Sequence, residues 1–187
     1  ETVTKMNVGL DYNLFKGLIA GSVEVFQDDR TDILVSGGER SVPGYFGGTP
    51  PTVNLGRVRA TGYEFELRVN KQFRNSLRLW GNFNMTHAEN VILKKDDPEL
   101  LPNYQKQAGY AIGQYRSHID AGFLNTWDEV YGSPAHETND AQRLPGDYYI
   151  VDFDGNGVID SKDSAPYGFT GTPENTYNAT IGVDFRF

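Results

Sequence analysis

The sequence has 187 residues, of which 38% are hydrophobic and 21 are glycine; this composition excludes a disordered chain and allows one domain or a piece of a larger one. It contains no cysteine, which excludes disulfides, thiolate zinc sites, iron–sulfur clusters and a cysteine nucleophile. The net charge of −8 argues against a nucleic-acid partner, and no apolar run approaches the ~18 residues of a membrane helix.

Apolar and polar residues alternate along five segments, and this pattern predicts an all-β chain. In chain order the segments are residues 6–14, 19–25, 63–70, 77–86 and 177–187. Each would place apolar side chains on one face of a strand and polar side chains on the other. No segment of comparable length has the 3.6-residue period of a helix.

The connections between these segments are unequal in length. A tight turn at 15–17 and a short link at 71–75 alternate with long segments at about 28–56 and 87–175. Short turns at one end and long loops at the other are typical of a transmembrane outer-membrane β-barrel with antiparallel strands and long external loops. Strands of about ten residues fit a tilted membrane crossing. Aromatic residues near the strand ends resemble interfacial girdles; they are Phe15, Phe73, Phe185, Phe187, Tyr63 and Tyr177.

A soluble sandwich or jelly roll would alternate in the same way, although its strands are usually only about 5–6 residues long. The polar faces would then be a solvated surface, whereas in a barrel they would line a wet lumen. Glu64 and Glu66 share one such face at about 7 Å, a spacing that also occurs in glycosidases. Because this spacing is common in strands, we interpret the pair as lumen lining and predict that the chain is not an enzyme.

Four segments in register resemble the SusC/RagA-type TonB-dependent outer-membrane transporters. The first is residues 1–35, with an alternating strand, a glycine turn and Gly21-Ser-Val-Glu-Val-Phe. The others are 54–67, similar to the family's Asn-x-Gly and Gly-x-Glu-x-x-Leu strand; 108–115, similar to its Gly-x-x-Ile-Gly segment; and 145–160, similar to its Pro-Gly-Asp and Asp-x-Asn-Gly-Asp-Gly loop.

The resemblance implies a plugged barrel of about 22 strands in the bacterial outer membrane, in contact with its lipid. It implies import of oligosaccharides or peptides, with a SusD-like surface lipoprotein and the TonB complex as partners. Residues 1–187 would be part of the barrel domain, with an external segment at about 87–175. We expect the chain to be a fragment, so no residue is assigned to energy coupling.

A calcium site is the strongest local prediction. Oxygen-bearing side chains and a glycine follow the spacing of a 12-residue calcium loop, with the carbonyl of the seventh residue as a further ligand. The predicted ligands are Asp152, Asp154, Asn156, Val158, Asp160 and Asp163. Residues 128–163 hold nine acids and two bases, or −7 of the net −8, and would repel themselves without a cation. An Asp/Asn/Gly-rich surface turn is the alternative.

The other candidate residues are weaker predictions. Tyr45, Phe46 and Trp127 are possible substrate contacts, since loop aromatics can stack on sugar rings or peptides. The three histidines have no partner at metal spacing. A soluble, calcium-dependent, glycan-binding β module remains the alternative function, and a hydrolase has the least support.

Overall fold

The computed structural model describes residues 1–187 except 44, 46, 74–76, 169–170 and 186–187. The chain forms two compact units. The sheet unit comprises residues 1–97, 107–112 and 171–187, and the loop unit comprises 98–106 and 113–170.

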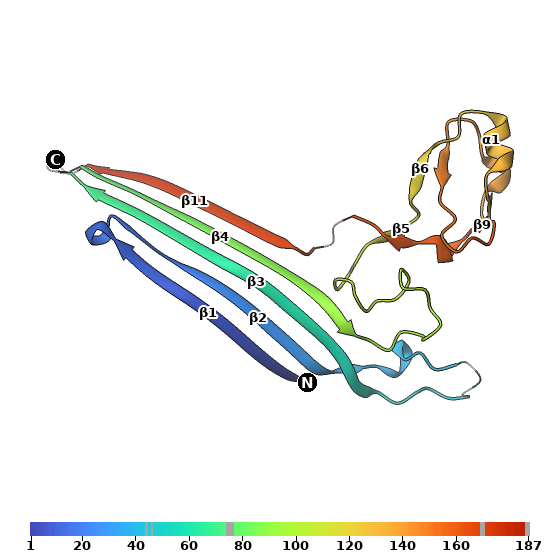
Figure 1. The fold of residues 1–187 in the computed structure, drawn as a ribbon, viewed down its shortest axis with the longest axis horizontal. Coiled ribbons are helices and arrows are strands. Elements are labelled where there is room, and N and C mark those ends of the chain that lie inside the picture. The colour runs from blue at the N-terminus through green and yellow to red at the C-terminus, as the bar shows by residue number, and fades with distance from the viewer. Residues whose placement is uncertain (44, 46, 74–76, 169–170, 186–187) are drawn as a thin grey trace. The chain divides into compact units, whose positions relative to one another are not determined.

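Five long strands form one sheet in the order β1-β2-β3-β4-β11, and every neighbouring pair is antiparallel (Figure 1). Their bounds are β1 Thr2–Leu14, β2 Ile19–Val35, β3 Val53–Gln72, β4 Leu77–Lys94 and β11 Glu174–Phe185. Each of the five alternating segments falls on one of these strands, except that residues 186–187 of the last segment lie outside the described residues. The predicted all-β, antiparallel fold is confirmed.

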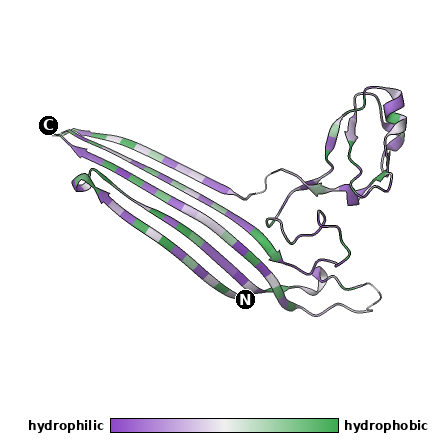
Figure 2. Ribbon diagram, viewed as in Figure 1, coloured by the Kyte–Doolittle hydropathy of each residue, from purple (hydrophilic) through white to green (hydrophobic). Residues whose placement is uncertain are grey.

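The register sorts the side chains of the sheet onto two faces. Because opposite residues share a face, one cross-strand row is apolar and the adjacent row is polar. The apolar row is Leu10, Val23, Phe65, Met85 and Tyr177. The adjacent row is Gly9, Glu24, Glu64, Thr86 and Thr176. Figure 2 shows the resulting hydrophilic and hydrophobic bands along the strands. We call the two surfaces the apolar face and the polar face.

The apolar face is exposed within the chain. Leu10 is 68% exposed and Ile181 is 87% exposed, whereas Val35 is the one buried apolar residue in the described part of the sheet unit. Exposure of such a surface to water is unfavourable in free energy, whereas exposure to the hydrocarbon of a lipid bilayer is not. Along β4 the apolar face runs from Leu77 to His87, about ten residues; at ~3.3 Å each and a ~45° tilt these cover ~24 Å. An outer-membrane barrel has an apolar band of about 25 Å.

The strands extend further than the alternation predicted. The long connections are therefore 36–52 and 95–173, rather than 28–56 and 87–175. Ion pairs join neighbouring strands in these additional parts. Examples are Arg59 Nε with Asp29 Oδ1 at 2.8 Å and Lys5 Nζ with Asp28 Oδ2 at 3.4 Å. A register shift around Ile33 interrupts the alternation there. Beyond the apolar band charged residues such as Arg59 and apolar residues such as Val58 occur on either face, so the alternation that marks a strand is lost.

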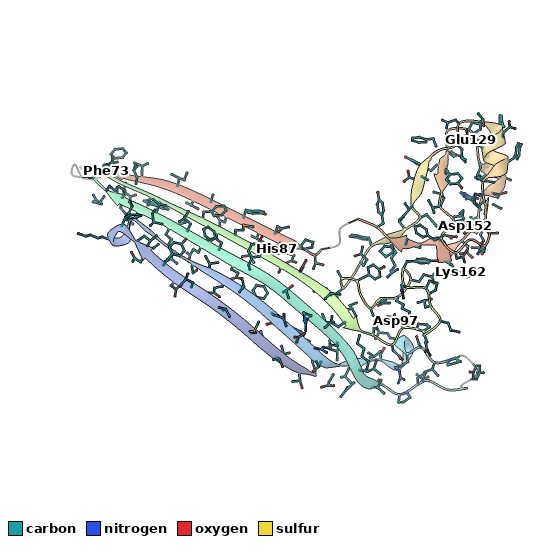
Figure 3. All side chains as sticks on the ribbon, viewed as in Figure 1. Phe73, His87, Asp97, Glu129, Asp152 and Lys162 are labelled. Carbon is teal, nitrogen blue, oxygen red and sulfur yellow. The ribbon has the colours of Figure 1, made fainter. Side chains whose placement is uncertain are left out.

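The short turns lie at the opposite end of the sheet. The first is η1 (Phe15–Gly17), in which the φ values of Phe15, Lys16 and Gly17 are 54°, 58° and 87°. In the second, the Phe73 N–H donates to the Leu77 carbonyl at 2.8 Å. Figure 3 shows Phe73 at this end of the sheet and Asp97 beyond the other end. Asp96 anchors the 36–52 connection, accepting from Arg40 Nε at 2.6 Å and Ser41 N at 3.1 Å.

The loop unit is built from short elements. Its strands pair as β10–β5, β6–β8 and β7–β9, the last in parallel. Their bounds are β5 Arg116–Ser117, β6 Asp120–Phe123, β7 Ala135–His136, β8 Tyr148–Ile150, β9 Val158–Ile159 and β10 Ala165–Pro166. The helices are α1 Trp127–Gly132, η4 Asp140–Gln142 and η5 Ser161–Asp163; η2 Gly37–Glu39 lies in the sheet unit. The small core contains Leu124, Val130, Ile159 and Ala165. No helix among the described residues has the length and hydropathy to span a membrane.

Aromatic side chains lie across glycines on neighbouring strands at three places in the sheet. Tyr12 crosses Gly21, and its hydroxyl donates to the Glu66 carbonyl at 2.9 Å. Phe26 covers Gly62 and Trp80 covers Gly182 in the same way. A Cβ at Gly21 would lie 1.9 Å from the Glu66 carbonyl oxygen, so only glycine fits there.

Replacing Gly21 tests this packing. We expect Gly21→Ala to destabilise the barrel by about 1–3 kcal/mol because the added methyl overpacks the site. The control is Gly81→Ala, whose Cβ would meet nothing closer than 3.4 Å. Urea unfolding of the complete receptor in lipid vesicles measures both changes. Equal stability of the two variants would contradict the assigned packing.

Candidate functional site

The predicted calcium loop begins with a carboxylate that gathers backbone N–H groups. Asp152 follows β8 and accepts from Gly155 at 2.8 Å, Asn156 at 3.2 Å and Gly157 at 2.7 Å. Gly155 and Gly157 have φ values of 72° and 84°, a region that glycine enters without strain. The sequence therefore curls the backbone tightly around Asp152.

Asp163 closes the loop from its other end and is fully buried. Its Oδ1 accepts from Phe153 N at 2.8 Å and Asp154 N at 3.4 Å, and its Oδ2 accepts from Asp160 N at 2.8 Å. Burial opposes ionisation of Asp163, but the N–H groups of Asp160, Phe153 and Asp154 outweigh it and hold its pKa below the usual range. Asp163 is therefore a buried anion held by the backbone.

Three of the six predicted ligands converge. Carboxylate oxygens of Asp152, Asp154 and Asp163 all lie within 4.8 Å of one another. The Asp160 carboxylate instead caps η5, accepting from Lys162 N at 2.6 Å. The Asn156 Oδ1 accepts from the N–H of Val158 at 2.7 Å, at the start of β9. The three converging carboxylates can offer oxygen ligands to a hard cation, whereas the Asp160 carboxylate also pairs with Lys162 Nζ at 3.5 Å.

Neighbouring segments of the loop unit hold this loop from outside. Tyr104 Oη and Gln105 Nε2 donate to the Lys162 carbonyl at 2.9 and 2.6 Å. The rings of Tyr104 and Phe153 pack with centroids 5.4 Å apart. The His118 Nε2 lies 2.7 Å from the Asp160 carbonyl oxygen. His118 thus has a structural partner, although the sequence shows it as an isolated histidine.

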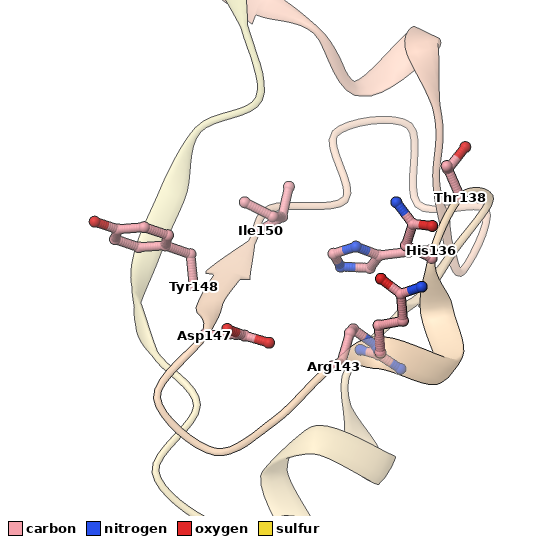
Figure 4. A pocket seen from close by; sticks show the side chains of 8 residues that line it. His136, Thr138, Arg143, Asp147, Tyr148 and Ile150 are labelled. Carbon is pink, nitrogen blue, oxygen red and sulfur yellow. The ribbon is translucent and has the colours of Figure 1, made fainter.

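The loop unit also has a pocket of about 360 Å³ that the sequence did not indicate. His136, Asn139, Gln142, Arg143, Asp147 and Ile150 contribute to its lining. Figure 4 shows the His136 ring directed toward Ile150, whereas the Tyr148 ring points away from the pocket. Burial and then the Arg143 charge lower the pKa of His136, which keeps the ring neutral near pH 7. The one feature of the sequence that could have indicated this pocket is the high density of amide and charged residues at 136–147.

Arg143 organises the floor of this pocket. Its Nη1 donates to the Pro134 carbonyl at 3.0 Å and to the Ser133 hydroxyl, and its Nη2 pairs with Asp140 Oδ1 at 2.9 Å. The Nε is buried without a hydrogen-bond partner in the described structure. The guanidinium group of Arg143 therefore stabilises the local fold of the loop unit through these contacts.

The predicted substrate contacts are distributed over both units. Tyr45 is an almost fully exposed residue of the 36–52 connection in the sheet unit. Trp127 begins α1 in the loop unit and stacks on Tyr131 with ring centroids 5.9 Å apart. Phe46 lies outside the described residues.

Glu64 and Glu66 both lie on the polar face of β3. Glu66 accepts from Arg68 Nε at 2.6 Å, and Glu64 lies directly opposite Glu24. The arrangement agrees with the interpretation of Glu64 and Glu66 as lumen lining.

A family model described as "TonB dependent receptor-like, beta-barrel" matches residues 1–187. The chain belongs to this family. Members of the TonB-dependent receptor family are outer-membrane proteins, so the exposed apolar face of the sheet is the surface that meets lipid. The family resemblance drawn from the sequence is confirmed, as is the location in the outer membrane.

Individual relatives agree with this assignment. The chain is 26% identical over 200 residues to TonB-dependent receptor P3 of Formosa agariphila, covering 100% of this chain and 19% of that receptor. It resembles a solved structure of the RagAB peptide transporter with a TM-score of 0.60 at 17% identity, covering 98% of this chain and 20% of that one. The RagAB peptide importer in its open-open state gives a TM-score of 0.61 at 16% identity, with 98% and 19% coverage. The chain therefore spans about a fifth of the length of these relatives.

The buried carboxylate of Asp163 should make the loop unit sensitive to acid. Because the pKa of Asp163 is lowered on folding, its stabilising effect is complete above the unfolded value of about 3.9 and is lost as the pH falls through the lower folded value. In calcium-free buffer, Asp163→Asn should speed hydrogen exchange at Phe153, Asp154 and Asp160 at pH 6. Glu137→Gln, which alters an exposed carboxylate of the same unit, is the control. Unchanged exchange in Asp163→Asn would show that the carboxylate does not hold the loop.

Proposed function

We propose that this chain is part of a receptor that imports oligosaccharides or peptides across the outer membrane. The family match over all 187 residues is the observation that supports this proposal most directly. The RagAB structures, described as a peptide transporter and importer, make peptides one candidate cargo class. The partners would be a SusD-like surface lipoprotein and the TonB complex, which supplies the energy.

The polar face of the sheet would form part of the wall of the transport path. Its rows carry carboxylates, amides and hydroxyls, as in Asp11, Ser22, Glu66, Asn84 and Asn178. Such a surface stays hydrated and offers many weak hydrogen bonds, which suits passage of polar cargo better than tight binding.

The alternative, a soluble calcium-dependent glycan-binding module, fits the apolar face poorly. A soluble protein would need a second layer over residues such as Leu10, Val23 and Phe65. No described segment of the sheet unit buries this face. The observation favours the membrane receptor.

Uptake by living cells tests the proposal. Cells that express the complete receptor should accumulate fluorescent peptides or oligosaccharides from a defined mixture, and deletion of the receptor or of TonB should abolish uptake of the same compounds. The cargo class is the one whose uptake both deletions remove. Uptake of neither class, or uptake that persists without TonB, would contradict a TonB-driven importer.

We also propose that the loop from Asp152 to Asp163 binds calcium, with Asp152, Asp154 and Asp163 as charged ligands. Three carboxylates within 4.8 Å repel one another in the absence of a cation. Asn156, the carbonyl of Val158 and a water molecule on Asp160 would complete an oxygen shell. Because Asp163 is shorter than the usual bidentate Glu, the affinity should be weak, with a dissociation constant on the order of 10⁻⁴ M.

Calorimetry on the complete receptor tests the calcium site. Asp152→Ala or Asp154→Ala should abolish calcium-dependent heat, since each removes a converging ligand. Asp147→Ala should matter much less, because its Oδ2 accepts from Leu144 N at 2.8 Å and lies outside the cluster. Absence of heat at millimolar calcium, or unchanged binding by Asp152→Ala, would rule the site out.

A further inference from the structure

The pocket at His136 lies between two walls of the loop unit. One wall is the segment from His136 to Arg143, and the other is the segment from Asp147 to Ile150. Figure 4 shows the His136 ring and the Asp147 carboxylate directed into the space between these walls. The volume of about 360 Å³ is at the small end of the ~300–1,000 Å³ range of small-molecule sites. The pocket therefore has the size of a small ligand or of one unit of a longer one.

The first wall is a tight turn that is held by its backbone and by Asp140. The Asp140 Oδ1 accepts from His136 N at 2.7 Å and pairs with Arg143 Nη2 at 2.9 Å. Gln142 N donates to the Asn139 carbonyl at 2.9 Å. Asn139 has a φ of 61°, in a region that asparagine enters more readily than most residues. The side chains of Asn139 and Gln142 are therefore not needed to hold the turn.

These side chains belong to a set of hydrogen-bonding groups that line the pocket. Among the described residues, four side chains of the first wall have no hydrogen-bond partner; they are His136, Thr138, Asn139 and Gln142. An amide, a hydroxyl and a neutral imidazole can each both donate and accept. On the second wall, Asp147 Oδ2 accepts from Leu144 N at 2.8 Å, which leaves Oδ1 as a further acceptor. The pocket thus offers donors and acceptors side by side.

The charges of the pocket do not favour an anionic ligand. Arg143 is the one base in the lining, and its guanidinium is used by Asp140 and by the Pro134 carbonyl. The lowered pKa of His136 keeps that ring neutral near pH 7. A carboxylate or phosphate would therefore meet the negative charge of Asp147 without a free cation to pair with.

The remaining lining distinguishes a sugar from an amine. An ammonium group could pair with Asp147, but it only donates and would leave the amide donors of Asn139 and Gln142 unused. Hydroxyl groups use donors and acceptors alike. Most of the surface that lines the pocket is carbon, and Ile150 is part of it. A sugar ring has the same two characters, since it carries hydroxyls at its edge and C–H groups on its faces.

We propose that this pocket binds an uncharged saccharide unit, with Asn139, Gln142 and Asp147 bonding its hydroxyl groups and Ile150 contacting its C–H groups. The inference deepens the proposed function, on which it rests for the role of the sugar as cargo. It selects the oligosaccharide from the two cargo classes and assigns a place on the receptor that recognises it.

Both walls of the pocket are formed without a ligand. The first is joined to β9, where Glu137 N donates to the Ile159 carbonyl at 3.0 Å. The second is joined to the chain before α1, where Leu124 N donates to the Asp147 carbonyl at 2.8 Å. A preformed site loses little free energy to ordering when it binds, so one saccharide unit can be held by a few hydrogen bonds.

Calorimetry on the complete receptor in nanodiscs tests the pocket, with neutral oligosaccharides of glucose, galactose, mannose or xylose as probes. At least one should bind at millimolar concentration. The double variant Asn139→Gly/Gln142→Ala should weaken its binding about 10- to 50-fold, because both amides are lost. Glycine at 139 keeps the observed φ without strain. Glu137→Ala is the matched control, since it shortens an exposed side chain of the same wall that does not line the pocket.

Salt and a competing ligand separate a sugar from an amine. Raising the salt from ~10 mM to ~150 mM should leave the affinity unchanged, because no charge is neutralised on binding. A lysine-containing peptide should not displace the saccharide. If hydrogen exchange at Glu137 shows that the double variant disturbs the first wall, Gln142→Ala alone takes its place, with a loss of about 5-fold.

Four results would each overturn the proposal. They are failure of every neutral oligosaccharide to bind, unchanged binding by the amide variants, an equal loss in Glu137→Ala, and displacement by the lysine peptide. Uptake by cells, measured in parallel, separates this proposal from import. A saccharide that binds through the pocket but is not taken up contradicts import alone. A saccharide that the wild type and the double variant bind and import equally contradicts the pocket alone.

Discussion

The sheet unit depends on one constraint: backbone N–H and C=O groups that cross lipid must bond to one another, because the hydrocarbon layer offers no water. Four antiparallel ladders satisfy this requirement among the five strands. The same ladders fix the register, and the register decides which side chains meet lipid. The free edges of β1 and β11 pair with no strand described here, so a closed barrel must supply neighbours for both.

The alternation in the sequence predicted the membrane-crossing part of each strand because opposite solvents lie on its two faces. A position that faces lipid, such as Phe65, must then be apolar, and the next position, Glu66, which faces the other side, must be polar. The prediction lost accuracy at 28–35 and 53–62, where the alternation is interrupted and ion pairs such as Arg59–Asp29 join the strands. An ion pair between strands depends on register, and a single sequence does not state the register.

In the loop unit, too, the sequence predicted features that depend on local interactions and missed those that depend on contacts between distant segments. The spacing from Asp152 to Asp163 predicted a cluster because twelve residues that turn around one carboxylate bring their own side chains together. It did not predict that Asp160 would cap η5, since the same side chain could serve either role. Nor did it predict the pocket at His136, because that pocket depends on contacts between irregular segments, such as Arg143 with Ser133 and Pro134.

The aromatic side chains that lie across glycines have a consequence for folding errors. A slip of one residue between β1 and β2 would turn apolar side chains into the lumen, and the lipid itself would reject it. A slip of two residues keeps every side chain on its proper face, so hydrophobicity does not penalise it. Such a slip would, however, move Tyr12 from Gly21 to Val23 or Ile19, whose branched side chains occupy the space of the ring. Together with Phe26–Gly62 and Trp80–Gly182, this contact lets the barrel distinguish correct pairing from the one misalignment that lipid tolerates.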